Sequence, residues 1–533
     1  MTAGNEFLDE LGAEWAGMGV SLRYHPSGLL EVGADSGRVV PIIESLVRNH
    51  DYQLASLAVR QVGSTFLLHY LLYGRSRPAP WVQCTVSTPG HAASVPSLST
   101  SVHAADWLER ESEDHFGMHF GGHPRLGDFV LHDEEWQEEV APMRKSFDPR
   151  IAAGQRRPNA DWRPRKILHA PGGFTMTVGP IHGGIAEPVH YLVETTGEDM
   201  TRVFPRLFYK YRAVEKQAEG RTIEEALLLA ERFDALHAFS HSLACCLAAE
   251  RALEAVVSPG DSAARVLFAE LERLRSHMGT IRAICGSTGL AVAESRAAIY
   301  EEELLRLCGE VAGHRYLFGL NTIGGLTRAF DAGTLQSLSQ KLTEFGAQLH
   351  KLERDLGASS SFLDRLEEVG VITLEQAAAH GLVGPVARAT GYGRDLRVTQ
   401  PYSGYDRFDF EAASETEGDG YARLRILFFE AYQSIRIIEQ VATGPARARG
   451  PEEPFKDDRQ KDAAFGFGWV EAPCGAAVHS LWLDENGRVE RYRIVPPSFL
   501  NWHGFHVAAE GFAFQDLPII LSTFGLSVAE SDR

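Results

Sequence analysis

The chain has 533 residues, 44% of them hydrophobic and 23% charged, which is the composition of an ordinary globular protein. A chain of this length exceeds what a single hydrophobic core holds, so we expect at least two domains. The formal net charge of −19 argues against a nucleic-acid-binding protein, because neutralising phosphates requires a basic surface.

The six cysteines are scattered and contain no C-x-x-C pair. The sequence therefore predicts neither a disulfide framework nor a thiolate metal site, and it indicates a reducing compartment. The first residues, MTAGNEFLDELGAEWAG, lack the basic and apolar regions of a signal peptide. No apolar run is long enough to cross a bilayer, so we expect no transmembrane segment in this chain.

Residues 1–147 predict an α+β domain. The stretch GRVVPIIESLVRNH (37–50) has the apolar spacing of an amphipathic helix. The stretches STFLLHYLLYG (64–74) and PWVQCTVST (80–88) are rich in β-forming residues and bounded by glycine or proline, which indicates paired strands. Residues 148–166 are poor in apolar side chains and rich in proline and arginine, so we interpret them as a linker.

Residues 167–533 predict a mostly α-helical bundle domain with small β elements. The apolar periodicity of this part is helical in several long segments separated by glycine-rich turns. These segments are residues 222–257, 263–284, 293–314, 332–356 and 421–444. Near the end, AVHSLWLDENGRVERYRIVPP (477–497) predicts a β-hairpin around an Asn-Gly turn.

The first of these helical segments contains an unusual polar group. RFDALHAFSHS (232–242) places Asp234, His237 and His241 at spacings of three and four residues. On a helix, these side chains would lie on one face. Such a face can hold a metal ion, or it can form a polar seam against a neighbouring subunit, and the spacing leaves both interpretations open.

Two resemblances cover most of the chain. The segment Glu109–Phe147, which begins ERESEDHFG and contains GGHPRL and APMRK, resembles the signature of the C subunit of respiratory complex I. Residues from Gly179 to Arg533 resemble the D subunit of complex I and the large subunits of membrane-bound, energy-converting nickel–iron hydrogenases. The matching stretches include GPIHGGIAEPVHY, LFGLNTIGG, GLVGPVARATG, DLRVTQPYSGY and YQSIRIIEQ. The resemblance implies a fused C/D-type subunit whose second domain has the fold of a hydrogenase large subunit.

The resemblance also locates the ligands of the nickel–iron site, which in the hydrogenases are four thiolates in two C-x-x-C pairs. In this chain the first pair falls on Asp234 and His237, and the second falls on Ser527 and Glu530. Soft sulfur ligands are what nickel and iron require in this family, so we expect no nickel–iron site and no hydrogenase activity. A replacement zinc or manganese site on these four residues stays open, but we prefer to interpret them as a hydrogen-bonded remnant.

The corresponding cavity of complex I is associated with a quinone headgroup held by a histidine and a tyrosine. Those two positions fall on Glu187 and Gly220 here. The Pro-Arg-Gly-Glu loop of the family reads PCGA, with Cys474 in place of the arginine. Glu187 and His241 are therefore expected to line the cavity, and quinone stays a candidate acceptor.

Proton transfer is implied by the retained Arg-x-x-Glu spacing of Arg212 and Glu215, whose glutamate is linked to proton transfer in hydrogenases. Burial would raise the pKa of Glu215 toward the working pH, whereas Arg212 on the same helical face would hold the carboxyl charged. Both interpretations stay open. Together with Asp234, His237 and His182, the pair is expected to form a polar proton path.

These features predict the large subunit of a membrane-associated redox complex that resembles NADH-quinone oxidoreductase. We expect the chain to bind no cofactor itself and to receive electrons from an iron–sulfur cluster in a small partner subunit. It would lie in the cytoplasm, at the inner face of the membrane, against membrane subunits that move protons or sodium ions. No glycine-rich loop follows a strand, so direct NADH binding is not expected. The alternative is a catalytically inactive scaffold of an ion-translocating complex.

Overall fold

The computed structural model describes residues 2–25, 28–90, 94–136, 140–150, 161–163, 172–182, 187–392, 395–444 and 463–533. The strands are β1 (Ser21–His25), β2 (Leu29–Ala34), β3 (Tyr52–Val62), β4 (Thr65–Gly74), β5 (Trp81–Pro89), β6 (Ser94–Pro96), β7 (His119–Gly121), β8 (Phe174–Val178), β9 (His190–Thr196), β10 (Asp199–Arg206), β11 (Asn321–Thr322), β12 (Gly325–Leu326), β13 (Ala464–Ala472), β14 (Gly475–Leu483) and β15 (Val489–Val495).

The helices are α1 (Thr2–Glu14), α2 (Val39–Asn49), α3 (Asp106–Phe116), α5 (Val214–Ala218), α6 (Ile223–Arg232), α7 (Ala238–Leu253), α8 (Pro259–Ser287), α9 (Ala291–Ala312), α10 (Ala332–Gly357), α11 (Ser360–Leu363), α12 (Leu374–His380), α13 (Gly384–Arg388), α14 (Leu396–Thr399), α15 (Gly420–Thr443), α16 (Pro497–Ala509), α17 (Leu517–Phe524) and α18 (Val528–Ser531). The short 3-10 helix η3 (His103–Ala105) precedes α3.

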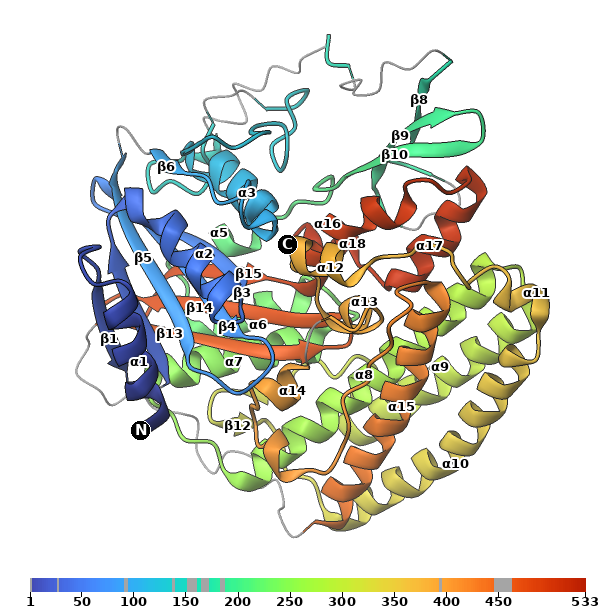
Figure 1. Cartoon of the computed structure of the whole chain (residues 1–533). Coiled ribbons are helices and arrows are strands. Elements are labelled where there is room, and N and C mark those ends of the chain that lie inside the picture. The colour runs from blue at the N-terminus through green and yellow to red at the C-terminus, as the bar shows by residue number, and fades with distance from the viewer. Residues whose placement is uncertain are drawn as a thin grey trace.

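The N-terminal part is built on a five-stranded sheet in the order β1-β2-β5-β4-β3. Strand β4 pairs antiparallel with both β3 and β5, which confirms the two strands expected at 64–74 and 80–88. The expected helix is α2, which buries Val39, Ile42 and Leu46 along one stripe, as helical spacing requires. Figure 1 shows α1 and α2 beside this sheet, at one side of the molecule.

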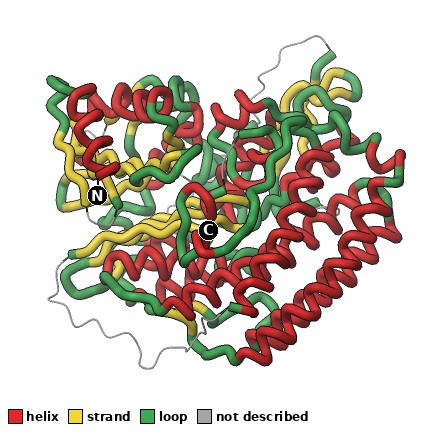
Figure 2. The backbone as a smooth tube through the Cα atoms, turned by 60° about the horizontal axis from the view of Figure 1, so that its bottom comes forward, coloured by secondary structure: helices red, strands yellow, loops and turns green. Residues whose placement is uncertain are grey.

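The C-terminal part is mostly helical, and the α+β-then-helical fold expected from the sequence is confirmed. The long helices α8, α9, α10 and α15 pack side by side, as Figure 2 shows. Beside this bundle, α7 lies against the sheet β13-β14-β15. A Cβ atom at Gly466 or Gly468 would come within 2.0 or 2.1 Å of a carbonyl oxygen of α7. Glycine at these positions therefore lets the helix pack directly on the strand backbone.

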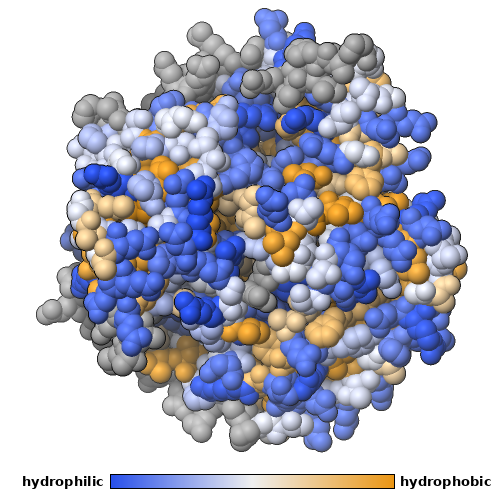
Figure 3. Space-filling view, in the orientation of Figure 1, coloured by the Kyte–Doolittle hydropathy of each residue, from blue (hydrophilic) through white to orange (hydrophobic). Residues whose placement is uncertain are grey.

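The hairpin expected at 477–497 is confirmed as β14 and β15, with β13 as a third strand. Most of the predicted linker at 148–166 lies outside the described residues, and the domain bounds of 1–147 and 167–533 stay a prediction. The face seen in Figure 3 is mainly hydrophilic, with apolar residues gathered near its middle. In the described part of the chain, no helix is long and apolar enough to cross a membrane.

The segment 222–257 is mostly helical, as expected, but it forms two helices. α6 ends at Arg232, and α7 starts at Ala238 with His237 as its N-cap. Between them, the carboxylate of Asp234 accepts hydrogen bonds from the backbone N–H groups of Leu236 at 3.4 Å and His237 at 3.2 Å. Such local bonds compete with the helical hydrogen bonds and end the helix. The polar residues of this stretch therefore do not share one helical face.

Candidate functional site

Six polar side chains lie buried together where the last helix of the chain meets the start of α7. Two come from the loop between α6 and α7, one from α7, one from the turn between β13 and β14, and two from α18 and its N-cap. We call this group the polar cluster, and its members are Asp234, His237, His241, Cys474, Ser527 and Glu530. None is more than 6% exposed. Figure 1 shows the C-terminus in the middle of the molecule, beside α16 and α18.

The carboxylates and imidazoles of the polar cluster contact each other directly. Nδ1 of His237 lies 2.8 Å from the carboxylate of Asp234 and 3.4 Å from that of Glu530. Nε2 of His241 lies 2.9 Å from the same oxygen of Glu530. Ser527 donates its hydroxyl to Asp234 at 3.2 Å and accepts the backbone N–H of Glu530 at 3.1 Å. The structure therefore brings together the residues that the resemblance placed at the nickel–iron ligands.

The charges within the polar cluster compensate each other. Burial alone would lower the pKa of His237, but Cys474, Glu530 and Asp234 raise it well above the ordinary value. Burial, together with the nearby carboxylate of Glu530, raises the pKa of the Cys474 thiol to about 11, so this thiol is neutral at pH 7. Burial would likewise raise the pKa of Glu530, but His237 and His241 hold it well below the ordinary value. His237 is thus an imidazolium between two carboxylates.

A nickel–iron centre does not fit this donor set. It requires four thiolates, and the polar cluster contains one protonated thiol, 3.7 Å from Glu530 and 3.9 Å from His237. Two overlapping triads, His237–Cys474–Glu530 and Asp234–His241–Glu530, have donor atoms within 4.8 Å of one another. A harder ion could bind to these groups, but the imidazolium of His237 already offsets one of the two carboxylate charges. The hydrogen-bonded remnant stays our interpretation.

From His241 the polar contacts continue into the C-terminal sheet. Nδ1 of His241 lies 3.1 Å from Nε2 of His479 in β14, and Nδ1 of His479 lies 2.6 Å from the hydroxyl of Tyr492 in β15. Burial lowers the pKa of His479 well below its ordinary value. A neutral imidazole can donate with one nitrogen and accept with the other. Polar contacts therefore run without a break from Asp234, through the polar cluster and His479, to Tyr492.

Glu215 lies in a separate buried ion group at β15. Its carboxylate is 2.8 Å from Arg491, 3.2 Å from Arg493 and 3.3 Å from Arg533. Burial would raise the pKa of Glu215, but these three guanidinium groups hold it far below its ordinary value. Arg493 and Arg533 also pair with Glu111 at 2.7 and 2.5 Å, which joins the N-terminal part to this site. Glu215 is therefore a fixed negative charge.

Arg212 does not occupy the expected position on a helical face shared with Glu215, and that prediction is wrong. α5 begins only at Val214, because Ala213 has a left-handed φ of 54°. The guanidinium of Arg212 instead donates to the carbonyl of Ala529 at 2.5 Å, at the edge of the polar cluster.

Glu187 and His182 are the two remaining residues that were predicted to belong to the site. Glu187 accepts hydrogen bonds from the backbone N–H groups of Val528 at 2.7 Å and Ala529 at 3.0 Å, so it caps α18 beside the polar cluster. His182 is exposed in this chain, and its expected place in a proton path stays a prediction. It follows β8, the outer strand of the sheet β10-β9-β8, which Figure 1 places at the rim of the molecule.

Several residues of the site were not predicted from the sequence. They are Cys474 as a member of the polar cluster, His479, Tyr492, Glu111, Arg491 and Arg493. The one available signal was in β15, VERYRIV, where two arginines stand in a strand flanked by apolar residues. Charged side chains buried in a strand need partners, so this pattern indicates a buried ion group.

Comparison with known proteins gave two family matches. Residues 33–152 match the model of the respiratory-chain NADH dehydrogenase 30 Kd subunit, and residues 295–465 and 455–533 match that of the 49 Kd subunit. These matches confirm the two resemblances and their order along the chain.

Among individual proteins, the D subunit of the NADH-quinone oxidoreductase of Geotalea uraniireducens (strain Rf4) is 30% identical over 68% of this chain and 98% of its own length. Formate hydrogenlyase subunit 5 of Escherichia coli (strain K12) is 27% identical over 89% of this chain and 83% of its own. The C/D subunit of the NADH-quinone oxidoreductase of Bdellovibrio bacteriovorus is 26% identical over 83% and 84% of the two chains. Relatives of both kinds thus span most of this chain.

Proposed function

Because the chain belongs to the family of the 49 Kd and 30 Kd subunits of the respiratory-chain NADH dehydrogenase, we propose that it is the large subunit of a complex I-like redox complex that works without nickel. The chain is also similar to formate hydrogenlyase subunit 5. The polar cluster favours the chemistry without nickel, because it supplies groups that carry protons and has one thiol where nickel–iron sites have four thiolates.

The observation that carries the proposal is the position of His237, whose Nδ1 lies 2.8 Å from Asp234 and 3.4 Å from Glu530, where the resemblance puts the metal ligands. A buried pair of carboxylates requires a cation nearby. In a hydrogenase the metal supplies that positive charge, and here a protonated side chain supplies it. The site thereby gains a proton that can be exchanged.

We further propose that this proton moves along the chain of groups from Asp234 to Tyr492. Every contact on that chain is 3.4 Å or shorter. When an electron reaches an acceptor near the polar cluster, the added negative charge favours delivery of a proton to that acceptor. The hydrogen-bonding groups from Asp234 to Tyr492 then return a proton to the group that gave one up. Glu215 serves as a fixed charge beside this path rather than as a carrier, because three arginines keep it ionised.

The partners follow from the family. A small subunit with an iron–sulfur cluster would deliver electrons, a quinone would accept electrons together with protons, and membrane subunits would move protons or sodium ions. The chain would then lie at the inner face of the membrane through these partners.

The test uses the assembled complex with its partner subunits. We expect His241→Gln to lower quinone reduction by about 10²-fold, the scale of lost acid–base catalysis, while the iron–sulfur signal and the assembly persist. His350→Gln, an exposed change on α10, is the matched control. Wild-type rates in the His241→Gln complex would contradict the proton path.

The scaffold alternative is favoured by one observation. Glu187, at the position of the quinone-binding histidine, is engaged with the backbone of α18. A small partner subunit without cluster cysteines, or a wild-type complex that passes no electrons to any quinone, would establish the scaffold and remove the redox role.

A further inference from the structure

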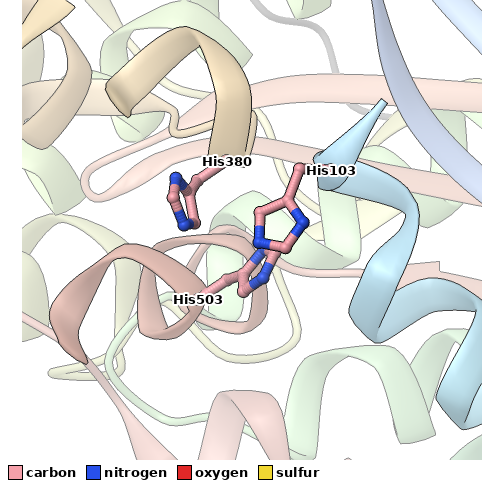
Figure 4. A group of neighbouring side chains, drawn as sticks. All are labelled: His103, His380 and His503. Atoms are coloured by element: carbon pink, nitrogen blue, oxygen red, sulfur yellow. The ribbon is translucent and has the colours of Figure 1, made fainter. Parts of the chain in front are cut away.

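Three histidines meet at the contact between the N-terminal and C-terminal parts, well outside the polar cluster. His103 starts η3, His380 ends α12, and His503 lies in the middle of α16. Figure 4 shows the three side chains pointing toward one another from these three segments. We propose that His103, His380 and His503 form a binding site for a transition-metal ion, best suited to Zn²⁺, which links the two parts of the chain.

The geometry of the three imidazoles is close to that of a metal site. One ring nitrogen from each histidine lies within 4.8 Å of the others. Ring centroids are 4.8 Å apart for His103 and His380, and 4.9 Å apart for each pair with His503. Zinc–nitrogen bonds of 2.0–2.1 Å in a tetrahedral site place the nitrogens about 3.4 Å apart. Side-chain adjustments of about 1 Å bring the donors to that distance.

Two of the rings are already held in the form that binds metal. Nδ1 of His380 lies 2.9 Å from the backbone carbonyl of Gln376, and Nδ1 of His103 lies 3.4 Å from that of Ser99. A carbonyl at Nδ1 requires the proton on that nitrogen, which leaves the lone pair of Nε2 for a metal. Among the described residues, no hydrogen bond engages Nε2 of either ring.

Neighbouring rings crowd the three imidazoles. His506, one turn further along α16, has its ring centroid 5.6 Å from that of His380. Protonated rings this close would repel one another. A single shared metal cation avoids that repulsion while binding all three lone pairs.

The carboxylate of Asp106 lies beside the histidine group. Asp106 lies 3.7 Å from Nε2 of His503 and 3.2 Å from Nε2 of His123. A carboxylate beside a ligating histidine raises its basicity and fixes its orientation. A cavity of about 160 Å³ lined by His103, Asp106 and His503 adjoins the group, which gives a water molecule access to a fourth coordination position.

The backbone around the site is fixed as well. Gly381, directly after His380, has a left-handed φ of 65°, and a Cβ atom there would meet Cβ of Ala104 at 2.7 Å. Gln53 donates to the carbonyl of Gly381 at 3.0 Å. The loop that carries His380 is therefore held tightly against the N-terminal part, next to His103. A metal ion at this point would join α12 and α16 to η3.

The experiment uses the full chain, stripped of metal by a chelator and then offered one equivalent of Zn²⁺. After desalting we expect one zinc per chain in the wild type. His380→Gln and His103→Gln should each weaken zinc binding by more than the ~10-fold that loss of an outer hydrogen-bond partner costs. The exposed His350→Gln and the polar-cluster change Asp234→Asn should keep the zinc. Circular dichroism checks that each variant is folded. If His380→Gln does not fold, the zinc content of His103→Gln tests the proposal instead.

Cobalt in place of zinc gives a second readout on the wild-type chain. We expect the visible absorption of a nitrogen- and oxygen-ligated, tetrahedral cobalt ion, without a thiolate-to-cobalt band. A thiolate band would place the metal on a cysteine and overturn the proposal. Failure of the wild type to retain zinc, or zinc that survives both histidine changes, would also overturn it.

Discussion

Two groups of histidines in this protein have different electrostatic surroundings. In the polar cluster, His237 and His241 face the carboxylates of Asp234 and Glu530, and one protonated ring offsets one of the two negative charges. At the contact between the two parts of the chain, His103, His380 and His503 face mainly one another.

The comparison teaches that the neighbours of a histidine, rather than the histidine itself, decide whether an external cation is required. Where carboxylates face the rings, a proton bound to one ring supplies positive charge at the site. Where neutral imidazoles converge, the lone pairs of their ring nitrogens can bind one metal ion together.

The largest expected effect is on the polar cluster itself. Glu530→Gln removes the carboxylate that lies 2.9 Å from Nε2 of His241 and accepts the backbone N–H of Ser498 at 3.0 Å, and it leaves Asp234 as the one carboxylate facing the two rings. We expect the free energy of unfolding to fall by about 3–5 kcal/mol, the cost of removing one partner of a buried ion pair. Urea denaturation measures it, with the exposed Glu485→Gln as the control. A loss below about 1 kcal/mol would contradict the charged state assigned here.

The histidine group at the contact should respond to metal instead. Zn²⁺ at 100 times its dissociation constant should raise the free energy of unfolding by about 2.7 kcal/mol, because it binds only the folded chain. The gain should vanish in His380→Gln and persist in Glu530→Gln, both followed by the same urea titration. A gain of equal size in His380→Gln would place the ion elsewhere.

A smaller effect is expected from pH. The folded-state pKa of His237 is raised, so its contribution to stability is complete below the unfolded pKa of about 6.5 and is lost as pH rises through the folded value. Between about pH 7 and pH 8 the wild type should lose about 1 kcal/mol that His237→Gln does not lose. Parallel slopes for the two proteins in this window would show that His237 is not an imidazolium.

The smallest effect is expected at Cys474. Its thiol is neutral, with a pKa of about 11, and it makes only long contacts of 3.7 to 3.9 Å in the polar cluster. Cys474→Ser should therefore change the free energy of unfolding by less than about 1 kcal/mol and leave the metal content unchanged. A large loss of stability together with loss of a bound metal would reveal a thiolate ligand.

The sequence allowed the membership of the polar cluster to be predicted in part. Asp234, His237, Ser527 and Glu530 were placed together because the family resemblance aligns them with ligands of one metal site. The break between α6 and α7 was not predicted, since apolar periodicity runs through it and the deciding event is the local bonding of the Asp234 carboxylate.

Other parts could not be predicted because they depend on distant segments. The partners of Glu215 come from β15 and from Arg533, so no local spacing relates them to Arg212. His103 and His380 lie in the two different parts of the chain and become neighbours only when these parts pack. Local patterns indicate helices and strands, whereas such contacts depend on tertiary structure.

In our proposal, protonated His237 occupies the place that a metal holds in the nickel–iron hydrogenases. The most direct test is the nickel and zinc content of the complex purified with its partners, compared between the wild type, Asp234→Asn and His380→Gln. The account predicts no nickel in any of them, and zinc that is lost in His380→Gln and kept in Asp234→Asn. Stoichiometric nickel, or any metal lost specifically in Asp234→Asn, would contradict it.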